Sequence, residues 1–211
     1  MKRILIVDDH SIIRAGLKIL LASDFSAYQF DEAATEDECL QLLKINDYSL
    51  IILDINIPGS DTFKLVETAL EINAENKILM FSMNAENIYA KRFLHIGVKG
   101  YIRKDEPTDE IVKAVREILG NKKYISKTLS ETLSNERFDR VMNNPFEKLS
   151  PKQFVIAQSL IKGSTVSDIC NEMQLHSSTV STQKNRIFEK LNIKNLVDLY
   201  SLAKVHTLAL T

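Results

Sequence analysis

Five polar residues at the ends of short apolar runs have the chemistry needed to transfer a phosphoryl group. Asp8 and Asp9 follow the first run, Asp54 follows a second, Ser82 a third and Lys104 a fourth. A carboxylate that attacks phosphorus meets charge repulsion, so it needs a divalent cation and positive or hydrogen-bonding groups for the phosphoryl oxygens. Three carboxylates suit Mg²⁺, which prefers oxygen ligands and keeps several of its waters. Lys104 would supply a positive charge and Ser82 a hydroxyl group.

The apolar runs that precede these residues are typical of buried parallel strands, and helix-length segments separate them. The runs are short and mostly β-branched or aromatic, and they cover residues 3–7, 50–53, 77–81 and 100–103. A further short strand is expected near residues 28–30, and amphipathic helices are expected over residues 10–22, 36–44, 61–71, 87–96 and 108–119. This alternation predicts an α/β fold with a doubly wound, five-stranded parallel sheet. The ligand site of such a sheet lies outside the carboxyl ends of its strands.

The composition of the 211-residue chain is that of an ordinary globular protein, and its length is enough for two domains. Hydrophobic residues make up 45% and charged residues 26%, with 6 Gly and 4 Pro, which excludes fibrous and low-complexity chains. No apolar run approaches the ~18 residues of a membrane span, and no cleavable signal follows Met1, so we expect a cytoplasmic protein. Cys39 and Cys170 are expected to be reduced. The histidines lack metal-ligand spacing, so no transition metal is expected.

The chain divides into three parts where its composition changes. Residues 1–120 hold the strand and helix alternation, residues 121–146 are predicted to be a polar linker that contains a helix, and residues 147–211 are predicted to form a small helical domain. The segment Ser150-Pro-Lys-Gln153 is a helix capping box at the start of that domain. Residues 146–211 hold 8 Lys and Arg against 5 Asp and Glu, although the net charge of the whole chain is −1. This asymmetry favours a polyanion partner for the helical domain.

Residues 2 to 120 resemble the receiver domain of two-component response regulators. Four segments carry the resemblance: Val7-Asp-Asp-His10, Leu53-Asp-Ile-Asn-Ile-Pro58, Phe81-Ser82 and Gly97-Val-Lys-Gly-Tyr-Ile-Arg-Lys-Asp105. The resemblance implies that Asp54 accepts a phosphoryl group and shares in holding Mg²⁺. It also implies that Asp9 is a metal ligand supported by Asp8, and that the backbone carbonyl of Asn56 is a further ligand.

The same resemblance assigns roles to Ser82, Lys104 and Tyr101. Ser82 and Lys104 would contact the phosphoryl group. Tyr101 falls at the family's switch aromatic, whose ring moves inward as the serine hydroxyl swings toward the phosphate; the alternative is a half-buried strand aromatic. Two positions depart from the family pattern, because Met83 stands where a very small residue is usual and Thr62 replaces a common loop glycine. We hypothesise that Met83 slows the entry of the phosphoryl donor or of water.

Helical periodicity in residues 177–191 separates an inward apolar set from an outward polar set. The inward set is Val180, Ile187 and Leu191, and the outward set is Ser181, Thr182, Lys184 and Asn185. Two helices joined by a tight turn, the second of them polar and basic outside, suit insertion into the major groove of DNA. The alternative is a four-helix unit that binds no nucleic acid, because polar outer faces are usually just solvated.

Residues 147 to 206 resemble the helix-turn-helix domain of LuxR-type regulators. The resemblance is carried by Leu149-Ser-Pro-Lys-Gln153, Gly163-Ser164, Ile169-Cys170, Ser177-Ser-Thr-Val180 and Ile187-Phe-Glu-Lys-Leu191. Joined to a receiver, this domain is similar to the NarL/FixJ class of response regulators. Three positions differ from the family pattern: Gln153 replaces glutamate, Gln183 replaces histidine and Ser181 replaces a frequent lysine. The last change removes a cation, so we expect modest DNA affinity or a strong dependence on dimerisation.

The polar residues of segment 177–191 divide into two kinds of DNA contact. Ser181, Thr182 and Asn185 are the candidates for base contacts, because Asn can bond adenine through both its amide oxygen and its amide NH₂, and hydroxyls can contact several bases. The candidates for phosphate contacts are Lys184, Arg186 and Lys190. The alternative for the last two is salt bridging along the helix surface.

These features together predict a phosphorylation-controlled transcription factor rather than an enzyme acting on a metabolite or other small molecule. A sensor histidine kinase would donate a phosphoryl group to Asp54, and the altered receiver would release the DNA-binding domain or make it form a homodimer. One alternative keeps this chemistry but lets the helical domain bind a protein instead of DNA. Another is a phosphatase or phosphomutase that uses Asp54 as nucleophile. Asn56 argues against the phosphatase or phosphomutase alternative, because haloacid-dehalogenase-like enzymes carry a second aspartate at the position of Asn56.

Overall fold

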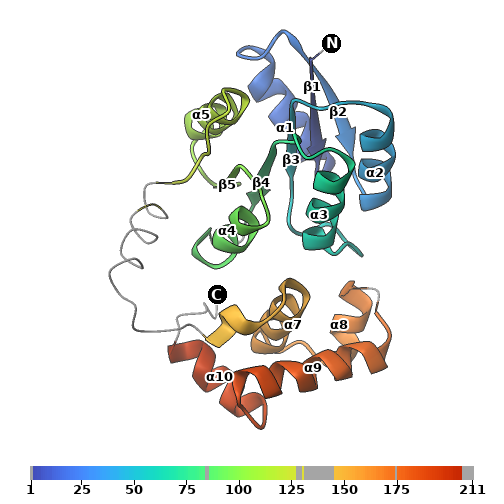
Figure 1. Cartoon of the computed structure of the whole chain (residues 1–211), viewed down its shortest axis with the longest axis vertical. Coiled ribbons are helices and arrows are strands. Elements are labelled where there is room, and N and C mark those ends of the chain that lie inside the picture. The colour runs from blue at the N-terminus through green and yellow to red at the C-terminus, as the bar shows by residue number, and fades with distance from the viewer. Residues whose placement is uncertain (1, 84–85, 127–129, 131–144, 174, 206–211) are drawn as a thin grey trace. The chain divides into compact units, whose positions relative to one another are not determined.

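The computed structural model describes residues 2–83, 86–126, 130, 145–173 and 175–205, which belong to two compact units (Figure 1). The N-terminal unit spans Met1–Asn135 and the C-terminal unit spans Glu136–Thr211. Each unit has buried apolar residues of its own. The helix expected within the linker falls on residues that lie outside the described part of the chain.

The N-terminal unit contains a five-stranded parallel sheet with the strand order β2-β1-β3-β4-β5. The strands are β1 (Lys2–Val7), β2 (Tyr28–Ala33), β3 (Leu50–Leu53), β4 (Ile78–Ser82) and β5 (Gly100–Arg103). The chain runs from β1 to one edge, returns to the other side of β1 and then continues to the opposite edge. This is the strand order of a doubly wound sheet, so the predicted fold class is confirmed.

Four helices connect these strands and a fifth follows β5, as the sequence predicts. They are α1 (Ser11–Ala22), α2 (Glu36–Ile45), α3 (Thr62–Ile72), α4 (Glu86–His95) and α5 (Thr108–Leu119). Local sequence sets several of their ends. The hydroxyl of Thr35 accepts the Glu38 N–H at 3.2 Å at the start of α2. An N-terminal cap of this kind satisfies a backbone N–H group that the first turn of a helix leaves without a partner. At the other end of a helix, Gly120 is the residue that follows the last turn of α5.

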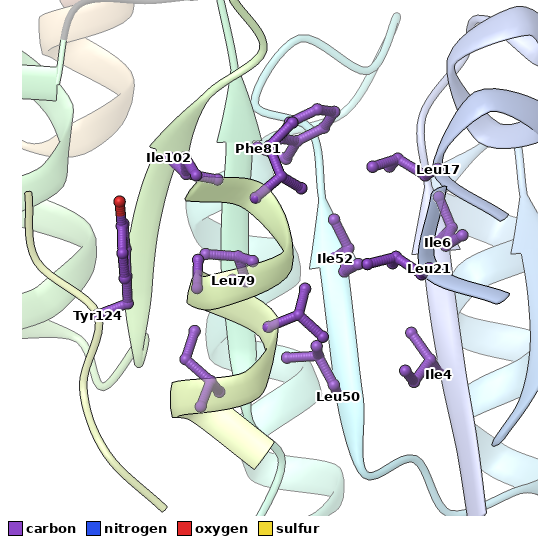
Figure 2. Packing of buried hydrophobic residues seen from close by; sticks show 14 of the residues in the cluster. Ile4, Ile6, Leu17, Leu21, Leu50, Ile52, Leu79, Phe81, Ile102 and Tyr124 are labelled. Carbon is purple, nitrogen blue, oxygen red and sulfur yellow. The ribbon is translucent and has the colours of Figure 1, made fainter. Parts of the chain in front are cut away.

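The main apolar core lies between the sheet and the helices α1 and α5 (Figure 2). Side chains alternate between the two faces of a strand, so Ile4 and Ile6 of β1 point to the same side. They meet Leu17 and Leu21 of α1 there, and all four side chains are buried. Burying a side chain of this size contributes roughly 1.5–3 kcal/mol. The core therefore holds the carboxyl ends of the strands in a fixed frame.

A second layer of buried apolar residues comes from α2, α3 and α4. Phe63 of α3 stacks on Phe93 of α4, with the ring centroids 4.1 Å apart. Cys39 of α2 is buried, and both it and Cys170 of the C-terminal unit are free thiols. Helices thus cover both faces of the sheet, which explains why its strands are apolar without interruption.

The chain stays packed against the N-terminal unit beyond the end of α5. Tyr124 forms an isolated parallel bridge with Gly100 of β5, and its N–H donates to the carbonyl of Lys99 at 2.9 Å. The Tyr124 side chain belongs to the main apolar core (Figure 2). Its hydroxyl donates to Glu110 of α5 at 2.9 Å. Tyr124 therefore fastens the start of the linker region to the edge of the sheet.

The C-terminal unit consists of short helices packed around α9. A 3-10 turn, Pro145–Lys148, precedes α7 (Pro151–Ile161), α8 (Val166–Met173), α9 (Ser177–Leu191) and α10 (Leu196–Val205). The predicted capping box is present, because the Ser150 hydroxyl accepts the Gln153 N–H and the Gln153 side chain accepts the Ser150 N–H. Within the described residues of both units, no helix is long and apolar enough to cross a membrane.

Candidate phosphoryl-transfer site and DNA-facing helix

The register of the sheet brings Asp8 and Asp54 together. Val7 of β1 pairs with Leu53 of β3, so the residue after each strand lies at the same edge of the sheet. The N–H of Asp54 donates to the carbonyl of Val7 at 2.9 Å, which fixes the backbone at this point. Both carboxylates are buried, with Asp54 only 3% exposed. The sequence prediction that these strand ends converge is confirmed by this geometry.

Lys104 joins the two carboxylates from the end of β5. Its ammonium Nζ lies 2.5 Å from Asp8 Oδ2 and 2.9 Å from Asp54 Oδ2. The Lys104 side chain is 8% exposed, and its backbone N–H donates to the carbonyl of Ser82 at 3.0 Å. Ser82 is completely buried at the end of β4. Four of the predicted site residues are thus held by the sheet itself rather than by long loops.

The electrostatics of this site favour a charged lysine beside a carboxylate that is hard to ionise. Burial raises the pKa of Asp54, and the Asp8 carboxylate adds to the rise, whereas the hydrogen bond from Lys104 opposes it. Burial acts to lower the pKa of Lys104, but its hydrogen bonds to Asp8 and Asp54 outweigh burial, and the net pKa is raised. Additional positive charge at this edge would therefore favour the ionised, nucleophilic form of Asp54.

The donor atoms present fit a small divalent cation. Ligand atoms of Asp8, Asp9 and His10 all lie within 4.8 Å of one another. Asp54 Oδ1 is buried and makes no hydrogen bond to any residue in the described part of the chain. An oxygen in this position is normally satisfied by a partner, and carboxylate oxygens are the ligands that Mg²⁺ prefers. The residues of this edge therefore meet the requirements of a magnesium site.

His10 is a member of this cluster that the sequence analysis did not select. Its Nδ1 lies 2.7 Å from Asp9 Oδ1, and its backbone N–H donates to Asp8 Oδ1 at 2.9 Å. Arg14 of α1 adds a hydrogen bond to the backbone carbonyl of Asp8 at 2.7 Å. The signal available in the sequence was the direct adjacency of His10 to the two aspartates. These contacts hold the Asp8 backbone and carboxylate in place.

The two departures from the receiver pattern occupy different environments. Thr62 is buried, and its hydroxyl donates to the carbonyl of Ile55 at 2.5 Å, so it braces the loop that carries Asn56. Asn56 itself is exposed. The Met83 side chain is 58% exposed immediately after Ser82, at the rim of the site. The hypothesis that Met83 hinders entry stays a prediction.

Tyr101 lies on β5 next to Met80 of β4 and is 1% exposed, so its ring is fully buried and not half-buried. Its role as the switch aromatic stays a prediction. The buried hydroxyl of Ser82 and the buried ring of Tyr101 lie on neighbouring strands. A change at the phosphoryl site could therefore reach the outer edge of the sheet through packed side chains.

In the C-terminal unit, α9 buries the predicted apolar face and exposes most of the predicted polar face. Val180, Ile187 and Leu191 are buried. Ser181, Thr182 and Asn185 of the predicted outward set are exposed, and so are Arg186 and Lys190, the other two candidates for phosphate contacts. The Thr182 hydroxyl donates to the carbonyl of Ser178 at 2.8 Å, which leaves its methyl group and lone pairs for other contacts.

Lys184 departs from the predicted outward position. Its side chain is half-buried, and its Nζ lies 5.7 Å from the centre of the Phe188 ring. Positions four residues apart are neighbours on a helix, so this cation-aromatic contact directs Lys184 along the surface of α9 toward Phe188. The hydrocarbon stem of a lysine covers apolar surface while its ammonium remains near water, a combination that periodicity alone does not indicate.

Gln153 connects α7 to α9 through a hydrogen-bond network. Its Oε1 accepts the Ser150 N–H at 3.0 Å and the Lys190 ammonium at 2.8 Å. Its Nε2 donates to Gln183 Oε1 at 3.1 Å. Gln153 and Gln183 each depart from the LuxR-type pattern, and the structure brings the two side chains into direct contact.

The fold and the two sites define a two-module signalling regulator, with an acidic receiver-type module and a helix-turn-helix module. Residues 4–116 match the response regulator receiver domain, and residues 147–203 match the luxR family of bacterial regulatory proteins. The chain therefore belongs to the two-component response regulators that join a receiver to a LuxR-type DNA-binding domain, the NarL/FixJ class predicted from its motifs.

Relatives and solved structures extend this match over nearly the whole chain. Response regulator UvrY of Escherichia coli (strain K12) is 27% identical over 209 residues, which cover 99% of this chain and 96% of that protein. Response regulator GacA of Pseudomonas viridiflava is 30% identical over 207 residues, with 98% and 97% covered. A structure of the RcsB response regulator of Salmonella typhimurium has a TM-score of 0.70 at 20% identity and covers 96% of this chain and 97% of that chain. Because only 20% of the aligned residues are identical, this structural likeness shows the fold alone.

Proposed function

We propose that Asp54 accepts a phosphoryl group from the phosphohistidine of a sensor kinase and that this modification controls DNA binding by the C-terminal unit. The observation that carries the proposal is the placement of a buried Asp54 carboxylate beside Lys104, with Oδ2 2.9 Å from the ammonium and Oδ1 free of hydrogen bonds to described residues. An attacking carboxylate oxygen and a fixed positive charge are the two parts that phosphoryl transfer requires of a protein.

The other residues of the site have complementary roles in this proposal. Asp9, Asp54 and the backbone carbonyl of Asn56 would hold Mg²⁺, with Asp8 in support. When bound, Mg²⁺ neutralises negative charge between the nucleophile and the phosphoryl oxygens. Lys104 and the Ser82 hydroxyl bind the remaining phosphoryl oxygens. The receiver in this way promotes its own phosphorylation and dephosphorylation, and it acts on no metabolite.

Transmission from Asp54 to the surface is proposed to follow Ser82 and Tyr101. Phosphorylation adds negative charge and acceptor oxygens next to a buried hydroxyl. A shift of the Ser82 hydroxyl toward the phosphate would stabilise the inward ring of Tyr101, and both residues are buried on adjacent strands. The free-energy difference between the two conformations shifts by the difference in stability that the phosphate confers on them, and the populations follow from that shift.

The output is proposed to be transcriptional regulation by a DNA-bound homodimer in the cytoplasm. Ser181, Thr182 and Asn185 would contact bases, and the phosphate contacts would come from Lys184, Arg186 and Lys190. A structure of RcsB from Salmonella enterica serovar Typhimurium is bound to the rprA promoter in the presence of the phosphomimetic BeF3−, with a TM-score of 0.68 to this chain. That complex supports the same use of the fold here.

The first test is the intact mass of the protein after incubation with acetyl phosphate, with and without Mg²⁺. We expect the mass to rise by one phosphoryl group only when Mg²⁺ is present, and no gain in Asp54→Asn. The modified protein should then bind duplex DNA more tightly than the unmodified protein, and the binding should weaken with salt because counterions are released. Modification of Asp54→Asn to the same extent would exclude Asp54 as the acceptor.

A further inference from the structure

The buried side chain of Gln153 has only one orientation that satisfies its neighbours. One end of its amide faces two donors, the Ser150 N–H at 3.0 Å and the Lys190 ammonium at 2.8 Å. Neither donor can accept a hydrogen bond, so this end must be the carbonyl oxygen. The opposite end is therefore the NH₂ group. Gln153 is 4% exposed, which makes a reversed amide, with donors facing donors, unfavourable.

The orientation of Gln153 in turn determines the orientation of Gln183. The Gln153 Nε2 group needs an acceptor, and the atom 3.1 Å away is Gln183 Oε1. Gln183 must therefore keep its oxygen toward α7, and its own NH₂ group points away from this contact. Gln183 is half-buried, so the NH₂ group lies where α9 meets the surface.

The residues beside Gln183 on α9 also present donors. Arg186 and Lys190 follow it by three and seven positions, which places the three side chains on one flank of the helix. Arg186 and Lys190 are exposed. Amide NH₂, guanidinium and ammonium groups all donate hydrogen bonds, and the phosphate groups of DNA only accept them. This flank borders the exposed polar face of α9 that carries Asn185.

We propose that Gln153 is a positioning residue for DNA binding, which holds the Gln183 amide so that its NH₂ group donates to a backbone phosphate beside Arg186 and Lys190. This inference rests on the proposed approach of α9 to DNA. Gln183 is then a phosphate contact that contributes to affinity for every sequence, not to the choice of bases. The two glutamines act as a pair, and a substitution in the buried one changes what the outer one presents.

The substitution Gln153→Glu separates this role from a purely structural one. A carboxylate still accepts from Ser150 and from Lys190, so the capping box and the link to α9 are retained. This carboxylate has no N–H to donate, so the side-chain amide of Gln183 must rotate by half a turn and donate from its NH₂ group to the carboxylate. The Gln183 oxygen would then face the phosphate. We expect binding of the full-length protein to a short mixed-sequence duplex at low salt, measured by fluorescence anisotropy, to weaken about tenfold.

Two further variants make the result specific to the proposed pair. Gln183→Met removes the outer amide from a half-buried position without a change of charge, and it should weaken binding by a similar factor. In the Gln183→Met background, Gln153→Glu should have little additional effect, because there is no amide left to turn. Asn171→Asp adds the same negative charge on the exposed surface of α8 and serves as the charge control.

Each outcome bears on a different claim. A loss of affinity in Gln153→Glu that exceeds the loss in Asn171→Asp and disappears in the Gln183→Met background supports the inference. Losses that add in the double variant, or unchanged affinity in Gln153→Glu with an unchanged melting temperature, would overturn it. If the parent protein fails to bind the duplex even at low salt, the proposed DNA contact of α9 is itself wrong.

Discussion

Asp54 is a residue whose reactivity opposes the stability of the fold. Burial raises its pKa, so the folded protein disfavours the ionised form of this carboxyl group. The stability associated with this group is fully present below the ordinary carboxyl pKa of about 4 and is lost as the pH rises through the raised pKa. Ionisation of this nucleophile therefore costs folding free energy.

We therefore predict that Asp54→Asn raises the melting temperature at neutral pH in the absence of Mg²⁺. The gain should shrink as the pH falls toward about 4, because the parent carboxyl becomes neutral as well. Calorimetric melting over a series of pH values would measure it. Asp47→Asn, at an exposed position, is the matched control and should show no such gain. A lower melting temperature for Asp54→Asn at neutral pH would contradict the argument.

Met83 offers a second prediction at the level of one residue. Its side chain is 58% exposed at the rim of the site, directly after Ser82. We expect Met83→Ala to be phosphorylated by acetyl phosphate several-fold faster, because a shorter side chain leaves more room for the donor. Single-turnover mass measurements would give the rate. Equal rates in the parent and the variant would show that Met83 does not limit entry.

The sequence predicted the main site residues because strand ends in a parallel sheet converge. Asp8, Asp54 and Lys104 each follow an apolar run, and no knowledge of side-chain rotation is needed to place them together. His10, and the contacts that Gln153 makes with Gln183 and Lys190 beyond its predicted capping box, could not be placed in this way. Their contacts depend on rotamers and on the packing of separate elements, which hydrophobic periodicity does not encode.

The contact between β5 and the segment that follows α5 is tightly packed. A Cβ atom on Gly100 would lie 2.9 Å from Ile118 Cδ1 and 3.0 Å from the carbonyl oxygen of Tyr124. Both distances are shorter than ordinary carbon contacts. Glycine is thus required at this position by the close approach of the Tyr124 backbone.

Gly100→Ala should destabilise the N-terminal unit by about 1–3 kcal/mol, because the added methyl group overpacks this contact. Urea unfolding would measure the loss, and hydrogen exchange at the Tyr124 N–H should become faster. Gly16→Ala on the exposed face of α1 is the control, since a Cβ there meets nothing within 4 Å. It should instead stabilise the helix by about 0.5–1 kcal/mol. Unchanged exchange at Tyr124 in Gly100→Ala would contradict this account.

Element boundaries were predicted well where the apolar pattern was continuous and less well where charged residues interrupted it. The strand expected near residues 28–30 extends to Ala33, through Asp31 and Glu32. Asp31 pairs with Arg3 of β1 at 2.7 Å, and Glu32 pairs with Arg14 of α1 at 3.0 Å. Edge strands accommodate such charges because one side of the strand is open. A sequence pattern cannot show which partners will neutralise them.

For the whole molecule, the order of the two modules was predictable from the change in hydrophobic period and from the separate motifs. The receiver and LuxR matches cover residues 4–116 and 147–203. The attachment of Tyr124 to the sheet was not predictable, because it follows the last amphipathic helix and has no periodic context. This attachment depends on the packing of the Tyr124 side chain against residues that are distant in the sequence.

The two cysteines differ in burial although both are free. Cys39 is 1% exposed, and burial, with a contribution from Glu36, raises the pKa of its thiol to about 12. Because the thiolate is the reactive form, Cys39 should resist alkylation at neutral pH, whereas the half-buried Cys170 of α8 should react. Peptide mass mapping after brief iodoacetamide treatment would test this, with Cys170→Ser as the control. Rapid modification of Cys39 in the native protein would contradict it.

The burial of Cys39 gives the natural chain a single chemically addressable thiol. A fluorophore attached to Cys170 would report from the helix-turn-helix module without any substitution in the receiver. Acetyl phosphate could then be added to one unmodified signalling site while the emission of the other module is followed in real time. The rate of change in emission would then measure how fast phosphorylation of Asp54 alters the DNA-binding helices around Cys170.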